Sequence, residues 1–177
     1  MITPRVRWLA LPLIAGLVSA AMTVKNPPSA WWAIVFGVLC LAPLARHDRY
    51  VWIRRVSLVA ASWVALRVSI VSGTKLYTVL EEGPHWSRLA VVTAVAGGLG
   101  ALLVGVAARI LLPMPLRAKS MVLMVALAAV AGGVLGLGSG PFYAGGVFLW
   151  QLTVGGALAR ARAETMNPKY VVQEERA

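Results

Sequence analysis

The stretch Val56–Gly73, VSLVAASWVALRVSIVSG, decides the class of fold. It is long enough to cross a bilayer as a helix, since about 20 apolar residues rising 1.5 Å each span roughly 30 Å of hydrocarbon. Arg67 lies well inside this apolar run. A charged residue at membrane depth is costly and tends to mark a functional site, a pathway or a subunit contact. The stretch therefore predicts a membrane-spanning helix that carries a candidate functional residue.

The composition of the whole chain indicates the same class. Hydrophobic residues make up 59% of the 177 and charged residues 13%, and the mean hydropathy is +0.78. An ordinary soluble domain has about 25% charged residues. The chain is therefore predicted to consist of several bilayer crossings rather than a soluble domain.

The other apolar segments are separated by prolines, glycines and charged residues, and they are Trp8–Val24, Ala30–Ala45, Leu89–Ala108, Ser120–Gly138 and Phe142–Ala159. The first follows two arginines and resembles a secretory signal peptide, but equally apolar segments follow, so we interpret it as a retained helix. We expect an all-α integral membrane protein, a six-transmembrane-helix bundle. One polytopic domain would cover residues 1–160, with a polar cytoplasmic tail at 161–177 and a short outer amphipathic segment near Tyr77–Trp86.

The distribution of basic residues predicts the orientation of these segments across the membrane. The formal net charge is +11. Thirteen basic residues would lie on one side of the membrane: Arg5, Arg7, Arg46, Arg49, Arg54, Arg55, Arg109, Arg117, Lys119, Arg160, Arg162, Lys169 and Arg176. Lys25, Lys75 and Arg88 would lie on the other side. Because cytoplasmic loops are rich in Lys and Arg, this partition predicts cytoplasmic termini in a bacterial-type inner membrane. Anionic lipid at the cytoplasmic face is then a sufficient partner for the charge, without nucleic acid.

Residues that could carry catalytic or metal chemistry are sparse. Every acidic residue falls in a predicted loop or the tail, which argues against an intramembrane proton relay. His47 and His85 are expected on opposite faces, and Cys40 is a lone cysteine. We therefore expect no metal centre, no cofactor and no catalytic residue. Ser139 sits among glycines as in a rhomboid protease motif, but no histidine follows it to act as the base.

The outer loop holds a weaker candidate. Glu81, Glu82 and His85 are close in sequence and could meet a metal ion or a ligand at the outer surface. A solvated loop is the favoured interpretation, because two acids and a histidine over a short span occur often without a ligand.

Small residues recur every four positions in two of the segments. The fourth segment has Gly97, Ala101 and Gly105, and the fifth has Ala128, Gly132, Gly136 and Gly140. Such ladders let transmembrane backbones approach closely. A tightly packed bundle is their ordinary meaning, and a homo-oligomer seam or a narrow path are the alternatives.

Arg67 and Gln151 are the candidate substrate or pore residues. Counted from Lys75 and Pro141, they lie about 12 Å and about 15 Å deep at 1.5 Å per residue, which predicts one shared layer open to the outer side. Snorkelling of Arg67, or capping of backbone carbonyls by it, is the plain alternative.

The preferred function is a transport, permeation or solute-binding subunit within an oligomer or a larger membrane complex. A lipid-modifying enzyme using the loops Arg46–Arg55 and Arg109–Lys119, and an anchor that recruits a soluble partner, are the alternatives. Size, six spans and cytoplasmic termini also resemble the substrate-binding components of energy-coupling-factor vitamin transporters. That resemblance covers hydropathy only.

Overall fold

The computed structural model describes residues 4–25, 31–45, 49–80, 84–112, 116–137 and 141–165, and helices account for nearly all of them. The long helices are α1 (Pro4–Lys25), α3 (Val51–Val79), α4 (His85–Leu111), α5 (Ala118–Gly136) and α6 (Pro141–Thr165). Between α1 and α3 lies a composite segment made of α2 (Trp31–Phe36), η1 (Gly37–Leu41) and η2 (Ala42–Leu44). No strand occurs in these residues, so the predicted all-α class is confirmed for the described part of the chain.

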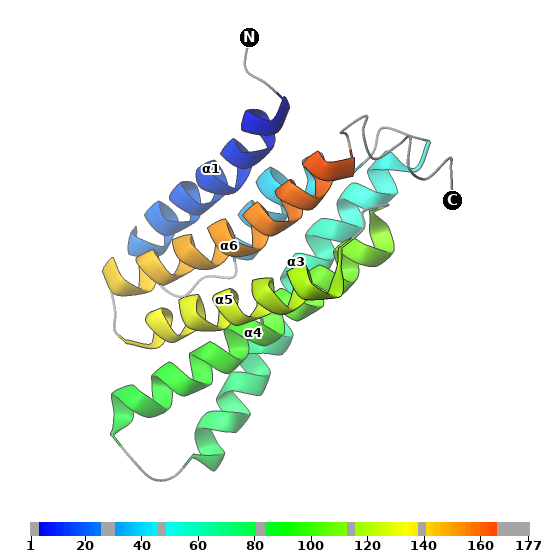
Figure 1. Cartoon of the computed structure of the whole chain (residues 1–177). Coiled ribbons are helices and arrows are strands. Elements are labelled where there is room, and N and C mark those ends of the chain that lie inside the picture. The colour runs from blue at the N-terminus through cyan, green and yellow to red at the C-terminus, as the bar shows by residue number, and fades with distance from the viewer. Residues whose placement is uncertain are drawn as a thin grey trace.

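Antiparallel neighbours build the bundle (Figure 1). The helix α4 packs against α5 and α3, and α6 packs against α1 and α5. The composite segment fills the space beside α1 and α3. The start of α1 and the end of α6 lie at the same end of the bundle, as expected for an even number of alternating segments (Figure 1).

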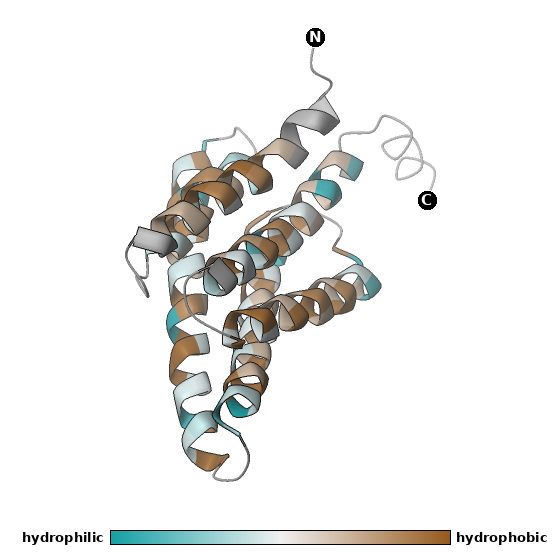
Figure 2. Ribbon diagram, turned by 90° about the vertical axis from the view of Figure 1, so that its left-hand side faces the viewer, coloured by the Kyte–Doolittle hydropathy of each residue, from teal (hydrophilic) through white to brown (hydrophobic). Residues whose placement is uncertain are grey.

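Three helices, α3, α4 and α5, are long and apolar enough to cross a membrane. The shorter stretches Ala10–Met22 and Trp31–Leu44 are also apolar. Hydrophobic residues occupy the middle lengths of the helices, and hydrophilic residues gather towards their ends (Figure 2). Large apolar side chains stay exposed on the outside, among them Leu17, Val71, Val122 and Val130. Apolar surface on this scale is what a lipid environment covers.

The composite segment differs from a regular helix for local reasons. The chain passes from α-helical to π-helical hydrogen bonding at Gly37–Leu41 and then to a 3₁₀ turn that contains Pro43. A Cβ on Gly37 would lie 2.9 Å from the Cα of Val59, so the segment approaches the backbone of α3 closely. Pro43 lacks the N–H that a regular α-helix would need at this position. The wider π-helical turn before it is a common local departure from α-helical hydrogen bonding.

The helices differ from the expected segments in two places. The described residues of the outer segment expected near Tyr77–Trp86 belong to the two long helices instead, because α3 continues through Val79 and α4 begins at His85. Nothing between Gly73 and Leu80 breaks the helix, and Thr74 donates a hydrogen bond to the Ile70 carbonyl at 3.0 Å. At the other end, α6 runs to Thr165, so its last turn extends past the apolar segment Phe142–Ala159. An ion pair one helical turn apart, Arg160–Glu164 at 3.1 Å, supports that extension.

Close glycine contacts join α4 to α5. A Cβ on Gly97 would lie 2.7 Å from the carbonyl oxygen of Ala128 and 3.0 Å from the Cα of Gly132. On Gly136 it would lie 2.6 Å from the Cα of Ala90. On Gly105 it would meet the sulfur of Met121 at 2.6 Å. The two small-residue ladders thus face each other within one chain, and Gly140 lies outside the described residues.

Candidate functional site

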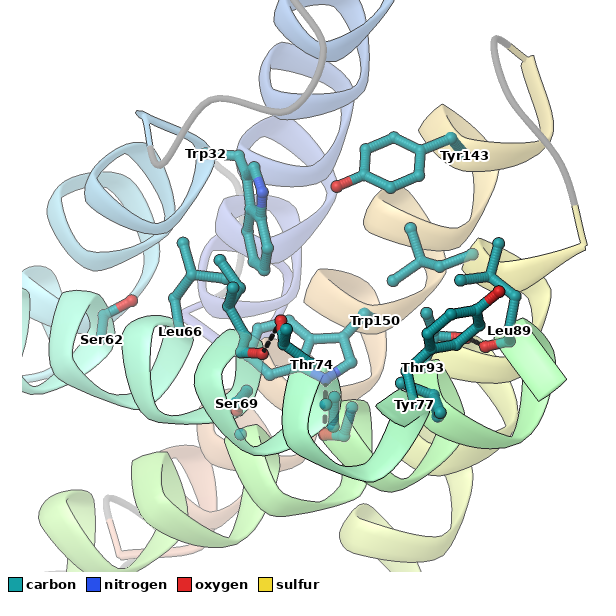
Figure 3. A pocket seen from close by; sticks show the side chains of 17 residues that line it. Trp32, Ser62, Leu66, Ser69, Thr74, Tyr77, Leu89, Thr93, Tyr143 and Trp150 are labelled. Atoms are coloured by element: carbon teal, nitrogen blue, oxygen red, sulfur yellow. Dashed lines mark hydrogen bonds between the residues drawn. The ribbon is translucent and has the colours of Figure 1, made fainter. Parts of the chain in front are cut away.

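A cavity of about 330 Å³ lies among α2, α3, α4, α5 and α6. Its walls come from α3 and α4, with single contributions from α2 and α5 and two aromatic residues from α6. Residues from Ser62 to Tyr77 on α3 line it, a rise of roughly 22 Å along the helix axis. The cavity therefore extends from the α3–α4 turn well into the bundle (Figure 3).

Trp150 forms an aromatic floor of this cavity and is fixed by a hydrogen bond and two ring contacts. Its indole Nε1–H donates to the Gly97 carbonyl oxygen at 2.9 Å. Edge-to-face contacts join its ring to Trp32 at 5.7 Å and to Phe36 at 5.5 Å between centroids. Gly97 thus serves twice, because its missing side chain admits α5 and its carbonyl fixes Trp150. A fixed aromatic floor is suited to stacking on a flat or apolar ligand.

Hydroxyl groups supply most of the polarity of the cavity wall, and those of serine and threonine already donate their protons to backbone carbonyls. Ser69 donates to the Ala65 carbonyl at 2.7 Å and Ser62 to the Ala33 carbonyl at 2.8 Å. Thr93 donates to the Leu89 carbonyl at 2.8 Å. Each oxygen keeps lone pairs that can accept a hydrogen bond. The Tyr143 hydroxyl points across the cavity towards Trp32 (Figure 3).

The described residues that line the cavity include no charged side chain. A cation at its rim is Arg88, whose guanidinium lies 4.5 Å from the centre of the Tyr77 ring. A terminal nitrogen of Arg88 also donates to the Tyr77 carbonyl at 3.0 Å. Arg88 therefore ties the start of α4 to the end of α3 at the mouth. The wall itself offers apolar and aromatic surface with a few acceptors.

Gln151 lies beside this cavity, deep in the bundle, and is fully buried at 0% exposure. Its amide nitrogen donates to the Ser19 hydroxyl at 2.9 Å and to the Trp32 carbonyl at 3.1 Å. Its amide oxygen is buried without a hydrogen-bond partner among the described residues. These contacts join α6 to α1 and α2, so Gln151 positions Trp32, which lines the cavity.

Arg67 occupies a different place from Gln151. It is exposed on the outer face of α3, with its guanidinium 5.6 Å from the centre of the Trp63 ring. The inward face of α3 is instead formed by Ser62, Leu66 and Ser69. Within a single chain the structure does not bring Arg67 and Gln151 into one layer around a common cavity.

Of the outer-loop candidates, only His85 belongs to the described residues, and Glu81 and Glu82 do not. His85 is exposed, and its ring makes an edge-to-face contact with Tyr77 at 6.0 Å. No group of three His, Cys, Asp or Glu residues in the described ranges is close enough together to hold a metal ion. Cys40 is buried at the contact between the composite segment and α6, where a Cβ on Gly155 would meet its sulfur at 2.6 Å.

Sequence reasoning missed the aromatic residues of the cavity. Trp32 and Tyr143 were interpreted as parts of membrane segments, since no pattern within one segment shows that they meet. One signal was available on α3. Ser62, Ala65, Ser69 and Gly73 form a stripe of small residues at helical spacing, and all of them are buried. Because successive residues turn by about 100°, that stripe places Arg67 away from the interior.

Comparisons of the chain with protein-family models, with curated proteins and with solved structures gave no match. The likeness to the substrate-binding components of energy-coupling-factor transporters consequently rests on hydropathy alone.

Proposed function

We propose that this chain is a multi-pass membrane protein that binds a small, uncharged, largely apolar solute in the cavity beneath Tyr77 and Tyr143, as a solute-binding, permeation or transport subunit. The observation that carries the proposal is the cavity itself, with about 330 Å³ of space and an aromatic floor fixed by Trp150. Pockets of this size lined by apolar and aromatic groups are typical small-molecule sites. A charged ligand would find no counter-ion on the described wall, and burying an unpaired charge is costly.

The proposed topology has six crossings and cytoplasmic termini. The directions of the helices support it, because Arg54, Arg109, Arg117 and Arg160 all belong to one end of the bundle, whereas Lys75 and Arg88 belong to the other. The end richer in basic residues would face the cytoplasm and its anionic lipids. The cavity would then open towards the outer side, where α3 and α4 meet.

Membership of an oligomer or a larger complex is also part of the proposal. Arg67 supports it, because this arginine lies at mid-length on α3 and faces away from its own chain. In a bilayer such a side chain needs a polar partner, which would come from a second membrane subunit. Among the described residues it has a ring contact with the half-exposed Trp63 but no hydrogen bond or ion pair.

Binding can be tested with naphthalene as a neutral probe and 2-naphthoate as its charged counterpart. Nanodiscs that contain the protein should bind more naphthalene than empty nanodiscs do. They should bind much less 2-naphthoate than naphthalene. Ala96→Trp, which fills the cavity from α4, should abolish the excess. Val95→Trp is the matched control, because Val95 is an exposed neighbour outside the cavity lining. Equal retention by wild type and Ala96→Trp would refute solute binding in this cavity and would favour the anchor.

A further inference from the structure

A second hollow lies on the outside of the bundle, between the composite segment and the first half of α3. This groove has a volume of about 760 Å³ and is almost entirely apolar. Val38 and Pro43 form one wall, and Val56 and Ala60 form the other. Along α3 it extends from Trp52 to Trp63, a rise of roughly 16 Å. The groove is separate from the cavity described above, and the two share no lining residue.

Arg55 gives this apolar groove a charged end. Its guanidinium carbon lies 5.2 Å from the centre of the Trp52 ring, and both residues line the groove. The Nε–H of Arg55 is buried and has no hydrogen-bond partner among the described residues. A buried donor without an acceptor costs free energy, and more so when it belongs to a charged group. The described chain therefore gives the Nε–H of Arg55 no acceptor, and the partly exposed remainder of the side chain can meet one from outside.

An anion from outside the chain is the natural acceptor. The acidic side chain in the described part of the chain, Glu164, is paired with Arg160 at 3.1 Å. Arg49 lies close to Arg55 in sequence and adds to the positive potential at this end of α3. The planar fork of arginine fits phosphate oxygens, which makes a phosphate group a good partner for Arg55.

We propose that this groove is a specific binding site for an anionic phospholipid, with its phosphate on Arg55 and an acyl chain lying along Val56 and Ala60. An amphiphile with one anionic end matches an apolar strip that has one cationic end. Arg55 lies about one helical turn into α3, near the basic end of the bundle, which is the level of lipid headgroups in the proposed topology. Basic pockets between helices at the cytoplasmic face are typical sites for anionic headgroups. The site rests on the proposed membrane location.

The experiment is native mass spectrometry of the full chain, released from micelles that contain phosphatidylglycerol or phosphatidylcholine with identical acyl chains. Wild type should retain phosphatidylglycerol preferentially. Arg55→Gln should weaken that retention about tenfold, the loss expected for one charge-assisted contact. Arg55→Lys should fall between the two, because it keeps the charge and loses the fork. Arg109→Gln is the control, since Arg109 is an exposed arginine outside the groove lining.

A second pair of variants tests the acyl-chain part of the site. Ala60→Trp should fill the groove and reduce retention, whereas Ile53→Trp, on the exposed surface outside the groove, should not. Equal losses in Arg55→Gln and Arg109→Gln would overturn the proposal in favour of diffuse charge attraction. Equal retention of both lipids by the wild type would overturn it as well. So would variants that change the number of protein chains in the complex and not the number of bound lipids. Membrane location is measured separately by flotation of the chain with liposomes, so its failure is distinguishable from failure of the groove.

Discussion

Alanine substitutions at the neighbouring glycines Gly132 and Gly133 can measure how much stability depends on the close approach of α4 and α5. A Cβ on Gly132 would overlap the carbonyl oxygen of Thr93 and lie 3.1 Å from the Cα of Gly97. A Cβ on Gly133 would lie 3.7 Å from the Cβ of Ala94 and 3.8 Å from the Ala90 carbonyl oxygen, which is ordinary contact. The obstacles at Gly132 are backbone atoms, which cannot move without separating the helices.

The two alanine variants differ in packing alone. Each replaces a glycine within α5 and gains about 1 kcal/mol of helix propensity. Overpacking a tight interface costs about 1–3 kcal/mol, and an immovable backbone obstacle favours the upper part of that range. We therefore expect Gly132→Ala to lose about 1–2 kcal/mol of stability and Gly133→Ala to gain up to about 1 kcal/mol. Their difference, about 2–3 kcal/mol, isolates the steric cost because the propensity gain cancels.

The assay is unfolding of the purified protein in mixed micelles by increasing sodium dodecyl sulfate, followed by circular dichroism. Wild type and both variants are compared in the same lipid and detergent. Gly132→Ala should unfold at a clearly lower denaturant fraction than Gly133→Ala. Equal midpoints would refute the reasoning, because they would mean that α4 and α5 are not in backbone contact at Thr93.

Three other predictions concern the interior, the exposed arginine and the topology. Gln151→Leu should cost about 1 kcal/mol of stability. In a double-mutant cycle with Ser19→Ala the two losses should not be additive, and additive losses would exclude a hydrogen bond between Gln151 and Ser19. Arg67→Leu should leave the stability of the isolated chain within about 1 kcal/mol but should lose any larger assembly on native gels, and wild-type assembly would contradict this. In a Cys40→Ser background, a cysteine placed at Ala177 should be inaccessible to impermeant reagents added to intact cells, and labelling from outside would reverse the proposed topology.

The sequence predicts the helices of this protein well because, if long apolar runs lie in lipid as proposed, they must satisfy all of their backbone hydrogen bonds internally. A continuous apolar run such as Leu89–Ala108 therefore has few alternatives to a helix. Its ends are harder to predict, because they depend on side chains met in the fold. Tyr77 prolongs the contact between α3 and α4 through Arg88 and His85, and neither contact follows from spacing along α3.

The interior polar groups show where sequence reasoning fails. The depth of Gln151 could be counted from the segment boundary. Its hydrogen-bond partner Ser19 is 132 residues away in the chain, on another helix. Arg67 could be counted to the same depth, yet depth alone does not give direction around the helix axis. The buried residues Ser62, Ser69 and Gly73 give that direction, and they do so because they are small, not because they are apolar.

The arrangement of polar groups also bears on what the cavity selects. Ser69 and Thr93 donate their protons to carbonyls of their own helices, so they offer mainly acceptor oxygens to a ligand. Trp150, the largest donor on the floor, is likewise committed to Gly97. A ligand that carries only acceptors would therefore depend on the Tyr77 and Tyr143 hydroxyls for donors and would leave its other polar atoms unpaired, which is costly away from water. The wall favours an apolar solute with at most a hydrogen-bond donor or two, and selection would come from shape against the fixed indole of Trp150.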